Sequence, residues 1–175
     1  MITIRLIAIA FVFIGCVLFG IWRDLDQKKR IEELEKFIYI FEILKAEIDF
    51  RLTPLKEACS IAANRIDNTL IIAIIDKFNS DLDEKKSTDV GEMWRNAIDY
   101  KRAELHLKDE DIKALHQFGT ACGYLDKNME KRNIEMSIVS LREIISGAKE
   151  EYIKASKLNR SLGILIGLGI SIFLL

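Results

Sequence analysis

Proline is almost absent from this sequence, since Pro54 is the only one in 175 residues, and there are just nine glycines. Proline breaks helices and glycine weakens them, so a chain poor in both can form long helices with short connections. The sequence therefore predicts an all-α protein. Thr53 is expected to cap the second helix, with Pro54 at its first helical position.

An excess of charge of either sign is also missing. The chain has 26 Lys and Arg residues and 27 Asp and Glu residues, so its formal net charge is −1. This excludes the overall positive field typical of nucleic-acid-binding proteins. Acidic and basic residues are mixed along the predicted helices, as on solvent-exposed helix faces. No nucleic acid is expected as a partner.

Cysteine and histidine are scarce. Cys16, Cys59 and Cys122 form no C-x-x-C pair, which argues against a disulfide framework or a zinc site and favours reduced thiols. His106 and His116 fall in different predicted elements, so they are not expected to share a metal ion. We expect no metal site.

Motifs of catalysis are missing as well. The sequence has no P-loop, no G-x-G-x-x-G and no H-E-x-x-H, and no spacing that supports a Ser-His-Asp triad. We expect no catalytic and no cofactor-binding residue, and we predict that the protein is not an enzyme.

Hydrophobic residues, by contrast, are concentrated at both ends of the chain. Leu6–Trp22 carries no charge, and as a helix it covers about 26 Å of a bilayer core of about 30 Å. Leu162–Leu175 is uncharged but shorter, which leaves open whether it spans fully. The sequence predicts an N-terminal transmembrane helix (1–23), a helical-bundle domain (24–158) and a C-terminal transmembrane helix (159–175).

The direction of these segments follows from the basic residues beside them. A cleaved lipoprotein signal is not favoured, because Phe13 occupies a position before Cys16 that usually holds a small aliphatic residue, and the apolar run continues beyond it. The positive-inside rule then predicts a multi-pass cell-membrane protein with its domain in the cytoplasm. The basic residues that support this are Arg23, Lys28, Lys29, Arg30, Lys154, Lys157 and Arg160.

Between the two ends, apolar residues recur at spacings of three and four, the period of a helix face. Asp67 or Asn68 is expected to cap the third helix and Ser87 or Asp89 the fourth, and a strand is the alternative for the β-branched run at 70–78. The apolar stripe of the first long helix is Leu34, Phe37, Phe41, Leu44 and Ile48, and that of the last helix is Ile134, Ile138, Leu141, Ile145, Ala148, Tyr152 and Ala155.

Several short motifs along the chain occur together in one known family. They are Ala46-Glu47-Ile48, Thr53-Pro54-Leu55, Ala58, Trp94, Phe118-Gly119, Gly123, Asp126, Asn159, Leu162-Gly163, Leu165, Gly167 and Leu168. Through these motifs the chain resembles the stage III sporulation protein AB family of endospore-forming bacteria. It departs from the family in having Cys122, where a leucine is usual.

The resemblance implies a six-helix antiparallel bundle, similar to the cytoplasmic domains of the type II secretion platform protein F, between two transmembrane helices. It implies a platform subunit of a channel between mother cell and forespore, in the mother-cell membrane facing the forespore. Its implied partners are a secretion-type ATPase, which the platform would couple to the membrane complex, other channel subunits and membrane lipid. A homo-oligomer is left open.

Glu47, Asp49 and Arg51 lie at the end of the first long helix, far along the chain from both hydrophobic segments. We predict that they contact the ATPase, and surface or capping charge is the alternative. A membrane-anchored helical signalling module is the alternative function, although almost no residues are left outside the membrane to sense a signal.

Overall fold

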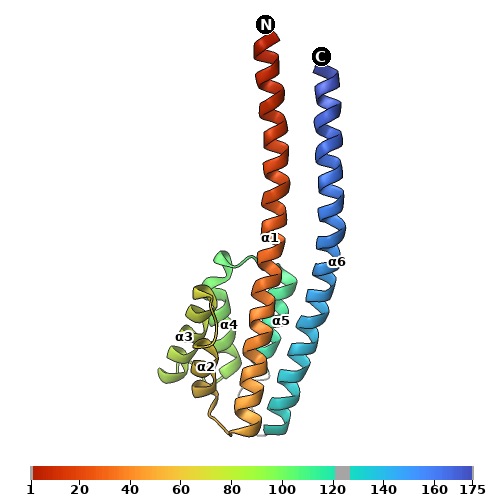
Figure 1. Ribbon diagram of the computed structural model, residues 1–175. Helices are drawn as coiled ribbons and strands as arrows, with labels where there is room; N and C mark the ends of the chain where they lie inside the picture. The colour runs from red at the N-terminus through yellow and green to blue at the C-terminus, as the bar shows by residue number, and fades with distance from the viewer. Residues whose placement is uncertain (1, 121–126, 175) are drawn as a thin grey trace. The chain divides into compact units, whose positions relative to one another are not determined.

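The structure is a computed structural model that describes the backbone of residues 2–120 and 127–174, with most side chains of residues 22–119 and 129–155. Within these residues there are six α-helices and no strand (Figure 1). The all-α prediction is confirmed, and residues 70–78 are helical. The helices are α1 (Ile2–Phe50), α2 (Leu55–Ala63), α3 (Thr69–Asp83), α4 (Val90–Lys101), α5 (Asp109–Thr120) and α6 (Lys127–Leu174), and a 3₁₀ turn, η1 (Arg102–Glu104), follows α4.

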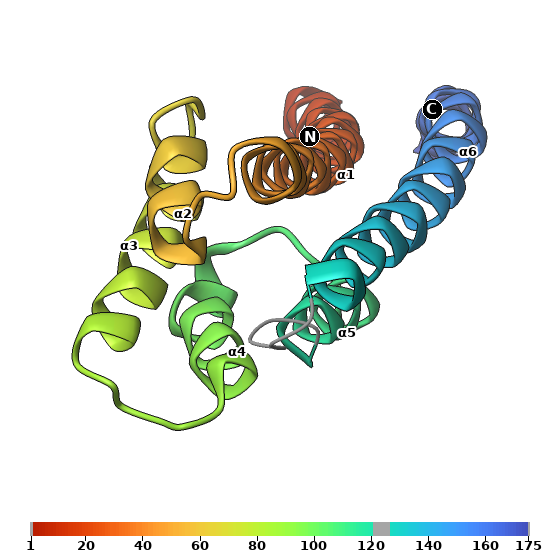
Figure 2. The ribbon, with the colours of Figure 1, turned by 90° about the horizontal axis from the view of Figure 1, so that it is seen from below.

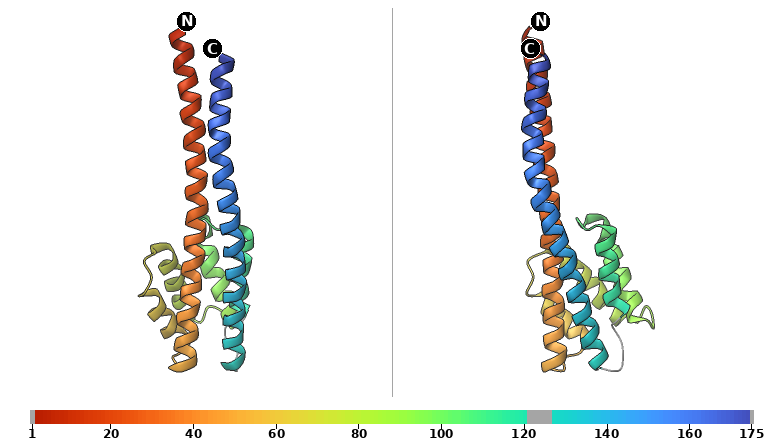
Figure 3. Two further views of the ribbon diagram at one scale, coloured as in Figure 1. Left: turned by 45° about the vertical axis from the view of Figure 1, so that its right-hand side comes forward. Right: turned by 90° about the vertical axis from the view of Figure 1, so that its right-hand side faces the viewer.

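The chain divides into two units, one of residues 1–29 and 147–175 and one of residues 30–146. In the first unit, the start of α1 and the end of α6 run alongside each other in opposite directions (Figure 3). In the described parts of the chain, no helix combines the length and the hydropathy that a membrane crossing requires. The anchors at 1–23 and 159–175 stay predictions. Predictions on Cys122, Gly123, Asp126 and the side chains of Cys16 and 159–175 lie outside the described residues.

The second unit is built around the part of α1 that it contains. Figure 2 shows α2, α3, α4 and α5 in succession beside α1, each packed on the next. The predicted stripe of α1 is buried, as are the matching positions of α6, and each such side chain stabilises the fold by about 1.5–3 kcal/mol. The buried residues are Leu34, Phe37, Phe41, Leu44 and Ile48 of α1 and Ile134, Ile138, Leu141 and Ile145 of α6. Further along α6, in the first unit, Ala148 is buried, but Tyr152 is only half-buried and Ala155 is exposed, so the predicted stripe is wrong at these last two positions.

Of the N-cap residues predicted for α2, α3 and α4, those of α3 and α4 are confirmed. The Asn68 side chain accepts hydrogen bonds from Leu70 and Ile71 at the start of α3, and that of Asp89 accepts one from Gly91 at the start of α4. The prediction that Thr53 caps α2 is wrong, because its hydroxyl donates to the Glu47 carboxylate instead. Pro54 is the N-cap residue, and α2 begins at Leu55, one residue later than predicted.

An aromatic cluster fills the centre of the second unit. The Trp94 ring lies 4.9 Å from that of Phe118 and 5.3 Å from that of Phe78, and Phe41 stacks on Phe118 at 4.1 Å. The Trp94 indole N–H donates to the Leu115 carbonyl oxygen at 2.8 Å. The four rings come from α1, α3, α4 and α5, so the cluster joins four helices.

Close contact between α4 and α5 depends on two glycines. A Cβ atom on Gly91 would lie 2.4 Å from the Gly119 carbonyl oxygen, and one on Gly119 would lie 2.8 Å from Cδ1 of Trp94. Real Cβ atoms do not approach other atoms this closely. Glycine at both positions therefore lets the two helix backbones touch beside the aromatic cluster.

Two residues of α1 hold the segment that leads into α5. The Arg30 guanidinium makes two hydrogen bonds to the buried Asp111 carboxylate, at 2.7 and 2.8 Å, and a third to Glu110. One turn further on, the buried Glu33 carboxylate accepts from the backbone N–H of His106 at 2.9 Å. The pKa of Arg30 is raised, chiefly by its hydrogen bond to Asp111. Arg30 is thus buried and paired with Asp111. This corrects its grouping with the basic residues that flank the first hydrophobic segment.

The end of α3 carries another buried charge, Asp81, which forms ion pairs with Lys77 and Lys86. Burial raises the pKa of Asp81, but hydrogen bonds from the two lysines outweigh it and leave the pKa below its usual value of 3.8. A carboxylate with a lowered pKa adds stability above its unfolded pKa of about 3.9, and this stability is lost as the pH falls through the lower folded value.

We therefore expect the unfolding midpoint to drop more steeply below about pH 4 in the native chain than in Asp81→Asn. Circular dichroism melts between about pH 7 and pH 2 measure this. Asp76→Asn is the matched control, because Asp76 lies on the same helix but is exposed. Equal pH dependence in native protein and Asp81→Asn would contradict the prediction.

Candidate functional site: the distal end of α1 and the groove beside α6

The structure separates the three residues that the sequence placed in a partner contact. Glu47 is only 4% exposed, and its carboxylate lies 3.3 Å from both the Arg51 guanidinium and the Thr53 hydroxyl. Its backbone carbonyl accepts from the N–H groups of Arg51 and Thr53. Glu47 therefore fixes the end of α1 from inside, and its carboxylate is buried; that Glu47 contacts a partner stays a prediction.

Asp49 and Arg51 differ from Glu47 in exposure. Asp49 forms a 2.6 Å ion pair with Lys131 of α6, and the hydrogen bond raises the pKa of Lys131. The Arg51 side chain is 67% exposed although it reaches back to Glu47. Of the three predicted residues, Arg51 presents the most accessible charged group.

Exposed apolar side chains flank Arg51. Phe50 is 84% exposed and Leu52 is 63% exposed. Leu52 also has a φ of 56°, a left-handed conformation that costs a residue with a Cβ about 1–2 kcal/mol. Neither side chain can be identified from the sequence, because an apolar residue at a helix end gives no pattern that separates exposure from burial.

Leu52→Gly is expected to stabilise the protein by about 1 kcal/mol, because glycine adopts this φ without strain and few contacts are lost. Urea unfolding followed by circular dichroism measures the change. Thr88→Gly is the control, since Thr88 is an exposed loop residue outside the left-handed region, and it should not gain stability. Destabilisation by Leu52→Gly would show that the leucine side chain makes contacts that offset its strain.

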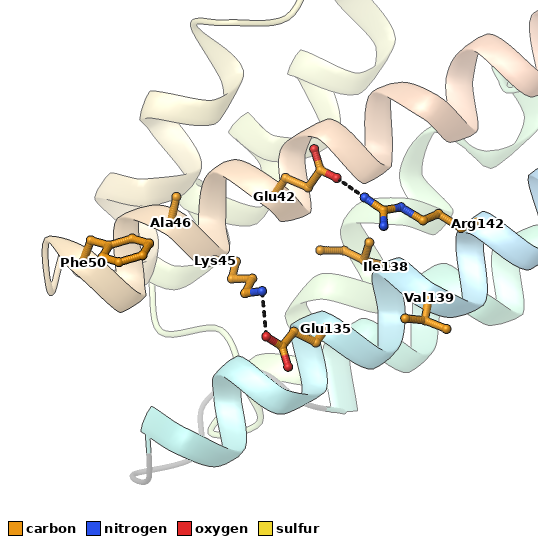
Figure 4. A pocket seen from close by; sticks show the side chains of 8 residues that line it. All are labelled: Glu42, Lys45, Ala46, Phe50, Glu135, Ile138, Val139 and Arg142. Atoms are coloured by element: carbon orange, nitrogen blue, oxygen red, sulfur yellow. Dashed lines mark hydrogen bonds and ion pairs between the residues drawn. The ribbon is translucent and has the colours of Figure 1, made fainter.

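A groove of about 510 Å³ lies between α1 and α6 in the second unit (Figure 4). Two ion pairs bridge it, Lys45 to Glu135 at 2.6 Å and Arg142 to Glu42 at 2.6 Å. The pKa of Glu135 is lowered, first by its hydrogen bond to Lys45. The remaining lining residues are the apolar Ala46, Phe50, Ile138 and Val139.

This groove has the chemistry of a protein-binding surface. Apolar groups line its centre and charged groups its edges, as in interfaces with an apolar core and a polar rim. No cysteine, histidine, serine or threonine lines it. In the part of the chain that the structure describes, no three His, Cys, Asp or Glu side chains gather where they could hold a metal ion.

The groove could not be found from the sequence, although one signal was present. Glu135 and Arg142 are seven residues apart, on one face of α6, and the exposed Val139 lies between them. Mixed charges of this kind also occur on any solvated helix, which is how they were interpreted. Their partners on α1 are up to 100 residues away in the sequence.

Comparison with known proteins gives consistent results. The family model described as stage III sporulation protein AB matches residues 5–175. The stage III sporulation protein AB of Bacillus subtilis (strain 168) is 24% identical over 168 residues, covering 94% of this chain and 95% of that protein. A solved structure of stage III sporulation protein AB (SpoIIIAB) has a similar fold, with a TM-score of 0.64 and 22% identity over 71% of this chain and 96% of the other.

Proposed function

Because the chain belongs to the stage III sporulation protein AB family, we propose that it is a membrane-anchored platform subunit of a sporulation channel between mother cell and forespore. The family match over residues 5–175 is the observation that carries this proposal. The surface at the C-terminal end of α1 (residues 50–52), called its distal end, supports the proposal. Its exposed apolar groups beside a charge suit binding to another protein.

The first part of the proposal is that residues 1–23 and 159–175 anchor the chain in the mother-cell membrane, with the second unit in the cytoplasm. Its support is the uncharged run Leu6–Trp22 and the uncharged end Leu162–Leu175, with basic residues on the inner flank of each. Lipid is then a partner of both ends.

Cysteine labelling tests this topology. Thr88→Cys places an exposed thiol in the α3–α4 loop, where a membrane-impermeant maleimide should label it only after the cells are opened. The protein should also stay with the membranes in carbonate extraction. Labelling of Thr88→Cys in intact cells, or release by carbonate, would overturn the assignment.

The second part is that the distal end of α1 binds the secretion-type ATPase and thereby couples it to the membrane subunits of the channel. Arg51 supplies a charge for an acidic group on the ATPase, and Leu52 supplies an apolar contact beside it. Strain in an exposed residue is frequently found at functional sites, and Leu52 fits that pattern.

Co-purification of the full-length chain with the ATPase tests this contact. Arg51→Glu combined with Leu52→Asp should reduce the captured ATPase at least ten-fold, while Tyr100→Asp, at an exposed position on α4, should not. Capture that is equal for both variants would move the contact elsewhere, and no capture by the native chain would overturn the coupling role.

A further inference from the structure

Two of the residues that line the groove between α1 and α6, Phe50 and Val139, have large apolar side chains that are exposed. In residues 30–146, seven described large hydrophobic residues are exposed, and five of these lie on the last turns of α1, just after it, or on the first turns of α6. Val139, which is 54% exposed, projects beside Ile138, whose buried side chain forms the floor (Figure 4). The five residues are Phe50, Leu52, Met129, Met136 and Val139.

The charges on the groove have an arrangement that selects an occupant. On α1, Glu42 is negative and Lys45 is positive, and on α6 their partners Arg142 and Glu135 have the opposite signs. Taken in order around the groove, Glu42, Lys45, Glu135 and Arg142 alternate in sign, so this group of four charges, called the charge square, has a net charge of zero. The charge square as a whole attracts no net charge, whereas an occupant with the same alternating square can match it.

A second copy of this chain has that square. A two-fold axis parallel to the helices places α1 of one copy opposite α6 of the other, so that Glu42 faces Arg142 of the partner subunit and Lys45 faces Glu135 of the partner subunit. All four charge contacts across the axis are then favourable. We propose that the α1–α6 groove is a self-association surface, through which two copies of this chain pair face to face about such an axis.

The course of the helices agrees with this symmetry. Within the second unit α1 and α6 are antiparallel. Arg30, the first residue of the unit, and Ser146, its last residue, therefore lie at the same end of the helix pair. A two-fold axis along the helices keeps these ends together in both copies. If the termini are anchored as proposed above, both copies can be held in one membrane, although the pairing itself does not depend on the ATPase contact.

The size of the surface sets the strength of the pairing. From Met129 to Arg142 α6 is about 20 Å long, and two helices side by side are about 20 Å wide, which gives roughly 400 Å² before side-chain relief is counted. A stable complex buries about 800 Å² on each partner. The pairing is therefore weak in dilute solution and strengthened when copies share a membrane, where their effective concentration is high.

A charge exchange tests the proposal with the full-length chain in nanodiscs or co-expressed in cells. The exchanged variant carries Glu42→Arg, Lys45→Glu, Glu135→Lys and Arg142→Glu, which keeps both ion pairs within each copy with reversed polarity. Native chains should pair with native chains, and exchanged chains with exchanged chains. Mixed pairs place like charges opposite each other, so they should be at least ten-fold depleted when two affinity tags report co-purification. Free mixing would overturn the proposal.

A second variant tests the apolar part of the surface. Val139→Lys should reduce native self-pairing at least ten-fold, while Tyr100→Lys, an equally exposed site on α4, should leave it unchanged. Circular dichroism confirms that both variants fold. The proposal would be overturned if the native chain stayed monomeric at every density of protein in the membrane. It would also be overturned if Val139→Lys blocked the binding of another subunit to the groove but left self-pairing unchanged.

Discussion

Asp111→Ala is expected to lower the free energy of unfolding by about 3–5 kcal/mol, because it leaves the buried Arg30 guanidinium without its main partner. Arg30 is 2% exposed and Asp111 is fully buried. The Asp111 carboxylate also accepts from the backbone N–H of Lys108, so the same substitution removes a contact at the start of α5. Urea unfolding followed by circular dichroism measures the loss.

A double substitution separates the buried charge from the contact itself. Arg30→Met with Asp111→Leu removes both charges and keeps apolar volume, so it should cost less than the sum of Arg30→Met and Asp111→Leu. Arg142→Ala serves as the exposed control and should cost no more than about 1 kcal/mol. An Asp111→Ala loss no larger than that of the control would show that water reaches Arg30.

The burial of Arg30 could not be predicted from the sequence. Its neighbours Lys28 and Lys29 are exposed, and all three were assigned together to a basic group beside the first hydrophobic segment. Whether a charged residue is solvated or buried depends on its partner in space, and Asp111 is 81 positions away. No local pattern contains that information.

Helix periodicity and capping, in contrast, are local, and they were predicted well. The apolar spacing of α1 and α6 identified buried residues, and Asn68 and Asp89 cap the helices that were expected. Thr53 was assigned as a cap by the same rule but bonds to Glu47, because the end of α1 brings a buried carboxylate within reach of its hydroxyl. Local rules fail where tertiary contacts offer a competing partner.

The candidate site was only partly predictable for the same reason. Arg51 was predicted as a contact from its place at the end of the helix, and its side chain is exposed. Glu47 was predicted for the same reason, but its side chain is buried. The groove needs both α1 and α6, and the pairing of Glu42 with Arg142 cannot be deduced from either helix alone. The sequence named residues at this end of α1 but not the groove beside it, and that they contact a partner stays a prediction.

Trp94→Ala is expected to destabilise the protein by about 3–5 kcal/mol, the usual cost of removing a large buried aromatic side chain. Trp94 is fully buried and packs on Phe41, Phe78 and Phe118, so its loss leaves a cavity shared by four helices. Gly91 and Gly119, which let α4 and α5 touch, have no side chains that could fill this cavity. Urea unfolding should be followed by circular dichroism, because the substitution removes a fluorophore.

Trp94→Phe separates packing from hydrogen bonding. Phenylalanine keeps an aromatic ring in the cluster but loses the indole N–H that donates to Leu115, so its cost should be smaller, about 1–3 kcal/mol. Tyr100→Ala, at an exposed position on the same helix, should change stability by less than about 0.5 kcal/mol. If Trp94→Phe cost as much as Trp94→Ala, the hydrogen bond to α5 rather than the cluster would hold these helices together.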